Sequence, residues 1–214
     1  MQINRSNNIT ISNDISGTGA LTQAGAGTTT LTGNNTYSGS TTVSAGALQI
    51  GNGGTSGTLG NGDVLNDTSL IFNRSDNFTV SNNISGTGTL VQQGTGTTTL
   101  TGSNIYSGDT IINAGILKIG TPNALSSFTN FIINGGALDL NSISTLNITN
   151  LSGTGGTIDL GTANLNVDQT VNGTYGGSIF GLGSLTKTGA ATLTLDGTNS
   201  YAGSTIISDG KPVS

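Results

Sequence analysis

The chain has 214 residues, enough for one domain with a substantial core. Its net charge is −5 and its five Lys and Arg residues are scattered singly, which excludes the basic surface that nucleic-acid binding requires. It contains no Cys, so it has neither disulfides nor Cys-based metal or redox sites. No apolar run approaches the roughly 20 residues of a membrane-spanning helix.

The composition predicts an all-β fold. The chain has 36 Gly and no Glu, and Thr, Val, Ile and Gly alternate as they do in strands and turns. Leu, Ile and Val recur at alternate positions in short bursts such as Ala-Leu-Gln-Ile-Gly, the pattern of a strand with one buried face. This alternation argues against disorder, which the low charge and the few aromatic residues would otherwise suggest.

Two long stretches, residues 4–51 and 73–120, are nearly identical, so that Asn4 corresponds to Asn73 and Gly51 to Gly120. A looser, partial third copy covers 179–210 and follows the second at a greater distance than the second follows the first. We interpret this excess as one inserted coil, because repetition is typical of solenoids, in which each copy buries its apolar side chains against the next. We therefore predict one right-handed parallel β-helix (β-solenoid) over residues 1–214, with coils of roughly 20 to 26 residues. A hairpin sandwich or a propeller is the less favoured alternative.

Strands and corners follow one another along each copy. Gly-containing corners are expected at 16–19 and 37–39, and again at 85–88 and 106–108. Comparison of the copies assigns the faces, because alternate strand residues point to opposite sides. The predicted inward residues are Leu31, Val43, Leu48 and Ile50, then Leu100, Ile112, Leu117 and Ile119, and finally Leu193, Leu195 and Ile207. Gln49 and Lys118 are expected to point outward. Residues 121–178 keep the strand pattern but match the repeat less closely.

The segment 31–51, LTGNNTYSGSTTVSAGALQIG, resembles the autotransporter-associated β-strand repeat of passenger regions in bacterial type V secreted proteins. Its linked features are Leu-Thr-Gly, Tyr-Ser-Gly, Thr-Thr-Val and Ala-Gly. Copies at 100–117 and 195–210 repeat most of them, although the third has Ala202 for Ser, Asp209 for Ala, and Pro212 where Leu117 aligns.

This resemblance implies a β-helical passenger on the surface of a Gram-negative bacterium, or released from it. We expect a non-catalytic rigid stalk or scaffold with an adhesin surface, whose partner is a host surface or an extracellular glycan or protein. The chain is expected to be a fragment of a longer passenger, with the signal peptide and the translocating outer-membrane barrel of the parent protein outside this sequence. The resemblance implies no activity, because one stalk architecture serves adhesins, proteases and filaments.

A polysaccharide-acting β-helix enzyme, lyase or hydrolase, is the main alternative. Such enzymes need clustered carboxylates, alone or with a basic partner. Asp139, Asp159 and Asp168 would approach one another if 137–168 spanned two neighbouring coils, with Lys187 nearby. The chain has no Glu and no His, so we favour solvated surface residues and predict no catalytic residue.

Three further patterns were considered as candidate sites. The segment 60–67, GNGDVLND, is similar to calcium-binding Gly- and Asp-rich repeats, but it occurs once and not in tandem, so we expect a self-satisfied turn and predict neither metal nor cofactor. Outward Thr residues could form an ice-binding face, a weaker alternative that needs a Thr pair on nearly every coil; they are Thr28, Thr30 and Thr32, Thr97, Thr99 and Thr101, and Thr192 and Thr194. Equivalent Tyr37, Tyr106 and Tyr201 could mark ligand contacts, but packing across the adjacent Gly corner is the favoured interpretation.

Overall fold

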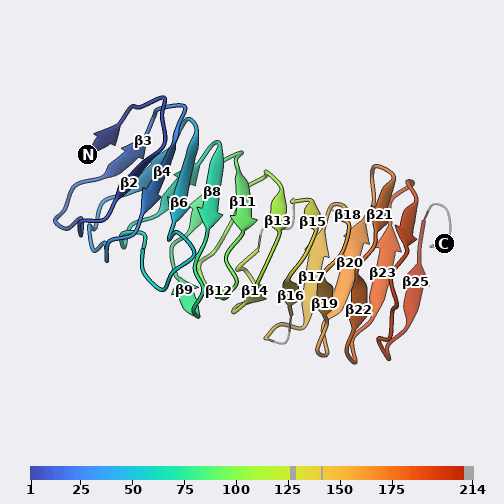
Figure 1. The fold of residues 1–214 in the computed structure, drawn as a ribbon. Helices are drawn as coiled ribbons and strands as arrows, with labels where there is room; N and C mark the ends of the chain where they lie inside the picture. Colours follow the sequence, from blue (N-terminus) through green and yellow to red (C-terminus); the bar gives the residue numbers. More distant parts are fainter. Residues whose placement is uncertain (126–128, 141, 210–214) are drawn as a thin grey trace.

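The computed structural model describes residues 1–125, 129–140 and 142–209 (Figure 1). These residues contain 25 strands and no helix, and they build an elongated β-solenoid of about ten coils. Every strand pairing among them is parallel, as between β3 and β5 or β20 and β23. The predicted parallel β-helix is confirmed.

The strands form five sheets. Sheet A consists of β1 (Gln2–Ile3), β3 (Leu21–Gln23), β5 (Thr41–Val43), β7 (Val64–Asn66) and β10 (Ile84–Ser85). Sheet B consists of β2 (Ile9–Ile11), β4 (Thr28–Leu31), β6 (Ala47–Ile50), β8 (Ser69–Phe72), β11 (Thr89–Gln92), β13 (Thr110–Ile112), β15 (Phe131–Ile133) and β18 (Leu151–Ser152). Sheet C consists of β9 (Phe78–Val80), β12 (Thr97–Leu100), β14 (Ile116–Ile119), β16 (Ala137–Asp139), β19 (Thr157–Asp159) and β22 (Ser178–Phe180). Sheet D consists of β17 (Thr145–Ile148), β20 (Asn164–Asp168), β23 (Leu185–Thr188) and β25 (Thr205–Ile207), and sheet E of β21 (Gly173–Tyr175) and β24 (Leu193–Leu195).

Each coil has three sides. Within one coil the chain runs through β15, β16, β17 and β18, and so passes from sheet B to sheet C to sheet D and back to sheet B. Sheets A and D form the same side of the solenoid, sheet A in the N-terminal coils and sheet D in the later ones. A bridge between Gly153 and Tyr175 continues sheet B into sheet E, so these two sheets also share a side. Bonds between equivalent positions of neighbouring coils mostly join residues with a spacing of 20, for example Ile84 with Asn104. The coil is therefore at the short end of the predicted length.

The first two copies of the repeat lie on different sides of the solenoid. In the first copy β3 and β4 belong to sheets A and B, whereas the equivalent strands of the second copy, β11 and β12, belong to sheets B and C. Along sheet A, pairing steps from Leu21 to Thr41, then to Val64 and Ile84, so these positions are three coils apart. The residue of the second copy that corresponds to Leu21 is Leu90, which follows Ile84 by six residues. These residues carry the chain from sheet A to sheet B, so the second copy begins one side further round the coil.

The third copy corrects the prediction of a single inserted coil. Pairing steps from Leu90 through three further coils to Leu151, and the bridge at Gly153 leads into β21 on a fourth. The equivalent strand of the third copy, β23, lies two sides beyond β21, in sheet D. The interval between the second and third copies is therefore longer than the interval between the first and second copies by one coil and one side. The stack tolerates this shift because every side makes the same kind of contact with the coil before it.

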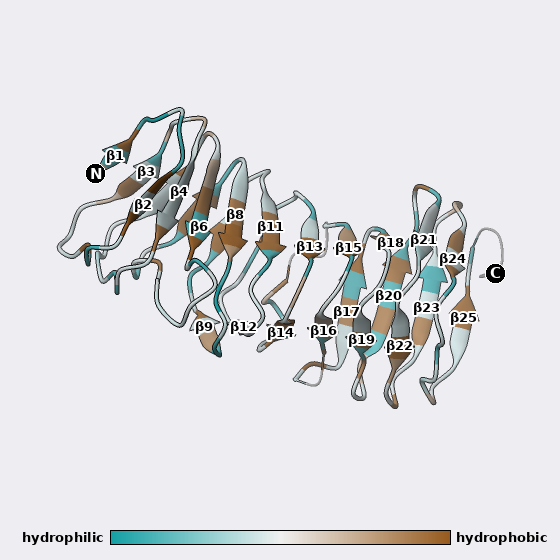
Figure 2. Ribbon diagram, in the orientation of Figure 1, coloured by the Kyte–Doolittle hydropathy of each residue, from teal (hydrophilic) through white to brown (hydrophobic). Residues whose placement is uncertain are grey.

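The predicted inward residues form the core. Leu31, Val43, Leu100 and Ile112 are completely buried, as are most of the other residues predicted to point inward. Figure 2 shows apolar residues alternating with polar ones along the strands. Leu195 is only partly buried and Ile207 is 42% exposed, because no described coil covers the last one.

The Ala-Gly corner recurs because two coils approach closely there. Gly115 has a φ of +59°, a conformation that residues with a Cβ rarely adopt. An added Cβ would also lie 2.3 Å from the Gly94 carbonyl oxygen of the preceding coil. The corner therefore requires Gly on both counts.

A polar core position shows how one substitution in the repeat requires another. Gln92 donates through Nε2 to the carbonyls of Gly94 (2.8 Å) and Gly96 (3.3 Å), and its Oε1 accepts a 2.6 Å bond from Thr98. Gln23 makes the same three contacts in the first copy. The third copy has Lys187 at this position, and a Lys side chain cannot accept a bond, so the equivalent of Thr98 there is the apolar Leu193.

We expect Gln92→Leu to lower the free energy of unfolding by about 1–3 kcal/mol, because it leaves the Thr98 hydroxyl and the buried Gly94 carbonyl without a partner. The neighbouring Gln93 is exposed, so Gln93→Leu is the matched control and should change stability by less than about 0.5 kcal/mol. Urea unfolding followed by circular dichroism measures both. Equal effects of the two substitutions would contradict a role for the buried amide.

Buried tyrosines make the fold sensitive to alkali. Burial raises the pKa of Tyr106 and of Tyr175 well above the usual range. In the unfolded chain a Tyr ionises near pH 10, so the unfolded state loses these protons first. The contribution of both groups is fully present below about pH 10 and is lost as the pH rises above it.

We therefore expect the unfolding midpoint in urea to fall steeply above about pH 10. Tyrosinate absorbance from Tyr106 and Tyr175 should appear together with the loss of the β-sheet dichroism signal. The variant Tyr106→Phe, Tyr175→Phe provides the comparison and should show a shallower decline. An equally steep decline in that double variant would rule out these two residues as the cause.

Candidate functional site

The structure brings together only part of the predicted carboxylate cluster. Asp139 on β16 and Asp159 on β19 pair on neighbouring coils of sheet C. Lys118, on the coil before, donates to Asp139 Oδ2 at 2.9 Å, and Asp159 Oδ1 accepts a 2.9 Å bond from the backbone N–H of Gly161. The result is a surface row of one Lys and two Asp residues along sheet C, with an ion pair between Lys118 and Asp139. The sequence predicted that Lys118 points outward but did not place it in this cluster.

The other two predicted members lie elsewhere. Asp168 ends β20 in sheet D, one side further round the coil, where Thr188 donates to its carboxylate at 3.3 Å. Lys187 points inward and is fully buried, and its Nζ donates to the carbonyls of Gly189 (2.8 Å) and Asp209 (3.3 Å). The cluster that the enzyme alternative requires is therefore not formed by Asp168 and Lys187, because neighbouring coils align only residues that share a side and a strand parity.

The segment 60–67 is held by amide side chains. Asn82 donates through Nδ2 to the carbonyls of Gly60 (2.8 Å) and Gly62 (2.6 Å), and Asn83 donates to Asp63 Oδ1 at 3.0 Å. These bonds occupy oxygens that a calcium ion would need. In the described part of the chain no three His, Cys, Asp or Glu residues gather as a metal-binding group.

The threonine sets do not combine into one face. Thr28 and Thr30 lie in sheet B, Thr97 and Thr99 in sheet C, and Thr194 in sheet E. In sheet B the outward column that contains Thr30 continues through Gln49, Ile71 and Val91. The regular Thr spacing that ice binding requires is therefore missing on this side.

The tyrosines at equivalent positions of the repeat pack at the corners, as the sequence predicted. Tyr37 and Tyr106 are buried, and each shares a 2.6 Å hydrogen bond with the Thr that begins the next strand, Thr41 and Thr110. Tyr201 makes the same contact with Thr205 in the last described coil.

An Asn just before each of these rings also ties neighbouring coils together. Asn35, Asn104 and Asn199 each accept a bond from the N–H of an Ile on the preceding coil, at 2.8 to 2.9 Å. The Asn and Tyr of the repeat motif are thus structural residues of the corner.

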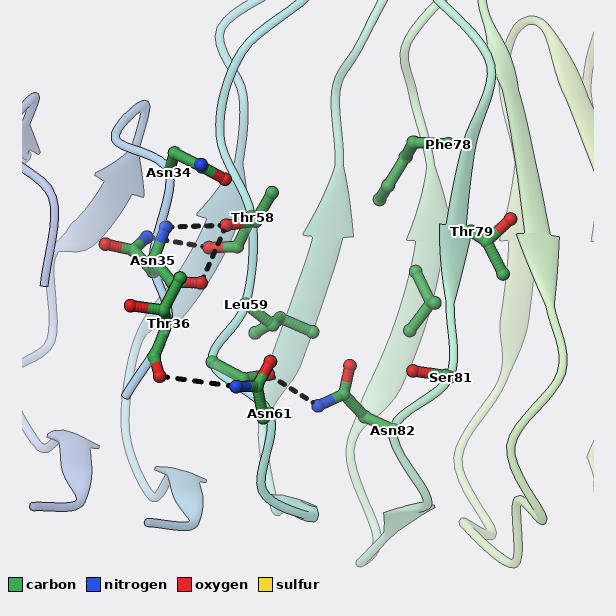
Figure 3. A pocket seen from close by; sticks show the side chains of 12 residues that line it. Asn34, Asn35, Thr36, Thr58, Leu59, Asn61, Phe78, Thr79, Ser81 and Asn82 are labelled. Atoms are coloured by element: carbon green, nitrogen blue, oxygen red, sulfur yellow. Dashed lines mark hydrogen bonds between the residues drawn. The ribbon is translucent and has the colours of Figure 1, made fainter. Parts of the chain in front are cut away.

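One concave site was not predicted from the sequence. A groove of about 250 Å³ opens where sheet C begins, between the preceding coil and β9 (Figure 3). Its walls are residues 34–36 and 58–61 on one side and 78–82 on the other. Leu59 and Val80 form an apolar floor, and none of the lining residues is charged.

The groove arises from an irregular coil. The Asn35 amide bonds to Thr58 across a spacing of 23, whereas the equivalent Asn104 bonds to Ala124 across the usual spacing of 20. Residues 51–57 form no strand, so β9 has a paired neighbour, β12, on one side only. The longer coil therefore leaves the edge of sheet C uncovered at this point.

Arg74 fixes the loop of this coil. It donates to the carbonyls of Thr55 and Gly57, both at 2.6 Å. Its guanidinium also bonds Asp76 at 2.7 Å and lies 4.8 Å from the Phe78 ring centroid. The Arg74 side chain holds the pKa of Asp76 below its usual range.

Several polar side chains line the groove without an internal partner. Among the described residues, no hydrogen bond is made by the side-chain amide of Asn34 or by the side-chain hydroxyls of Thr36, Thr79 and Ser81. Asn61 uses its Nδ2 for the Thr36 carbonyl at 3.3 Å, which leaves its Oδ1 available. The sequence signal for this site was the excess length of one coil, which becomes visible only once the usual coil length is known.

The architecture defines the chain as a parallel β-solenoid. Three of its segments, 21–50, 90–119 and 185–211, match the family model of the passenger-associated-transport-repeat. The first two matches lie within the first two copies and the last overlaps the third, which confirms the resemblance to an autotransporter passenger repeat and implies a secreted, cell-surface or extracellular protein. Comparison with curated proteins and with solved structures finds no match. In the described residues there is no helix of the length and apolar character needed to cross a membrane.

Proposed function

We propose that the chain is a non-catalytic scaffold segment of an autotransporter passenger, exposed on a Gram-negative cell surface as a rigid rod with polar sides available for adhesion. The carrying observation is that the passenger repeats share one uninterrupted core although the first two copies begin on different sides of the coil. About ten coils at the usual strand spacing of roughly 4.8 Å give a rod about 50 Å long. Its mechanical unit is the coil, because each coil contacts only its two neighbours.

Polysaccharide cleavage is the second candidate, and the arrangement of charges gives it little support. Asp139 is paired with Lys118, Asp168 lies on another side, and Lys187 is buried among carbonyls. A glycosidase or lyase needs its acid and base on one accessible surface. The ion pair between Lys118 and Asp139 instead joins two adjacent coils.

A rod built of interchangeable coils should tolerate the loss of one whole coil. Deletion of residues 165–184 brings β23 into the place of β20, because Leu165 pairs with Leu185. We expect a folded, shorter solenoid whose urea m-value falls by roughly a tenth. Deletion of 165–174 is the control: it shifts each later strand by half a coil and should abolish cooperative unfolding. If both deletions behave alike, the coil is not the structural unit.

Surface exposure and lack of catalysis are tested on the protein in its own bacterium. Antibodies raised against the purified chain should label intact cells, and proteinase K added outside should remove that label. The purified chain should release no unsaturated uronate or reducing ends from polygalacturonate or alginate. Cleavage of either polymer, retained by the folded protein and lost in Asp139→Asn, would refute the scaffold proposal in favour of an enzyme.

A further inference from the structure

We propose that the groove beside β9 binds a short segment of a neutral glycan, one or two sugar rings long. Its volume of about 250 Å³ lies just below the roughly 300–1,000 Å³ of sites for drug-sized ligands. The groove is partly open to solvent, so a ligand can enter it from outside. This inference goes beyond the scaffold role and does not depend on it.

The lining chemistry selects a ligand with many hydroxyl groups. Asn34 offers a donor and an acceptor in one side chain, and Ser81 adds a hydroxyl from the opposite wall (Figure 3). Sugar hydroxyls likewise donate and accept. On the second wall, the partly buried Phe78 provides apolar surface against which the C–H faces of a sugar ring pack.

Both walls are fixed before any ligand arrives. Asn35 and Thr58 exchange three hydrogen bonds of 2.7 to 3.1 Å, which join the two segments of one wall. Arg74 ties Gly57 at one end of the groove, and Asn82 ties Gly60 at the other. A site held in this way loses little conformational entropy on binding, so a few hydrogen bonds suffice for measurable affinity.

The polar lining is not required by the fold. At the positions equivalent to Asn34 and Thr36, the second copy has Ser103 and Ile105, and it forms the same strands and the same Tyr contact. A neutral ligand is favoured over an anionic one, because the nearby Arg74 is paired with Asp76 and the chain carries a net charge of −5.

An extended peptide added to the open edge of β9 fits less well. β9 has three residues, and the tethers made by Arg74 and Asn82 close the gap at both of its ends. A peptide needs a continuous free edge to form its ladder of main-chain bonds.

The test is a titration of the full ¹⁵N-labelled chain with maltose, cellobiose, lactose and diacetylchitobiose, followed by amide chemical shifts. We expect at least one disaccharide to shift amides confined to residues 34–36, 58–61 and 78–82, with a dissociation constant on the order of 1 mM. The double variant Asn34→Ala, Ser81→Ala should bind about tenfold more weakly, since two hydrogen bonds are lost. Ser103→Ala alters the position equivalent to Asn34 outside the groove and should bind as the unaltered chain does.

Three results would overturn the proposal. The first is the absence of groove shifts with all four disaccharides at about 20 mM, well above the expected dissociation constant. The second is equal affinity of the double variant, measured on protein whose dichroism spectrum shows it to be folded. The third is tighter binding of digalacturonate, or of a Thr- and Val-rich hexapeptide, than of every neutral sugar. None of these results would affect the scaffold role, which the coil deletion and the cell-surface labelling test separately.

Discussion

The structure depends on main-chain hydrogen bonding between equivalent positions of successive coils. Every described strand bonds in parallel to the strand one coil away, so each inward side chain packs against its counterpart in the next coil. Because this contact is the same on all three sides, a copy of the repeat does not need a particular side. This explains how the first and second copies, which share most of their residues, fold identically on different sheets.

At one core position of the repeat, a buried polar side chain is matched by partners that come from the same repeat. Gln92 is matched by Thr98, and Lys187 by Leu193 and by carbonyls of its own corner and the next coil. Burying an amide or an ammonium without such bonds would cost more than most single contacts supply. The repeat therefore varies in linked pairs: Gln92 occurs with Thr98, and Lys187 with Leu193.

The fold could be predicted because repetition and parity are properties of the sequence itself. Leu31, Val43 and Leu100 were correctly placed inside, since only one parity of each strand carries apolar residues in all copies. The side of the coil could not be predicted, because it depends on the exact number of residues in every intervening corner. For that reason, of the three Asp residues considered for the enzyme alternative, Asp139 and Asp159 pair on neighbouring coils and Asp168 lies on another side.

Variation that can carry specificity is confined to outward positions and to coils of unusual length. The inward positions are fixed by packing, and the corners by close approach of the backbone, as at Gly115. The extra residues of a long coil cannot enter the core, so they leave the stack as a loop and interrupt the sheet beside it. The groove next to β9 follows from this interruption, and the bonds from Arg74 and Asn82 keep it open without loss of the core beneath. In a solenoid of this type, an irregular coil length in the sequence is accordingly the place to look first for a binding site.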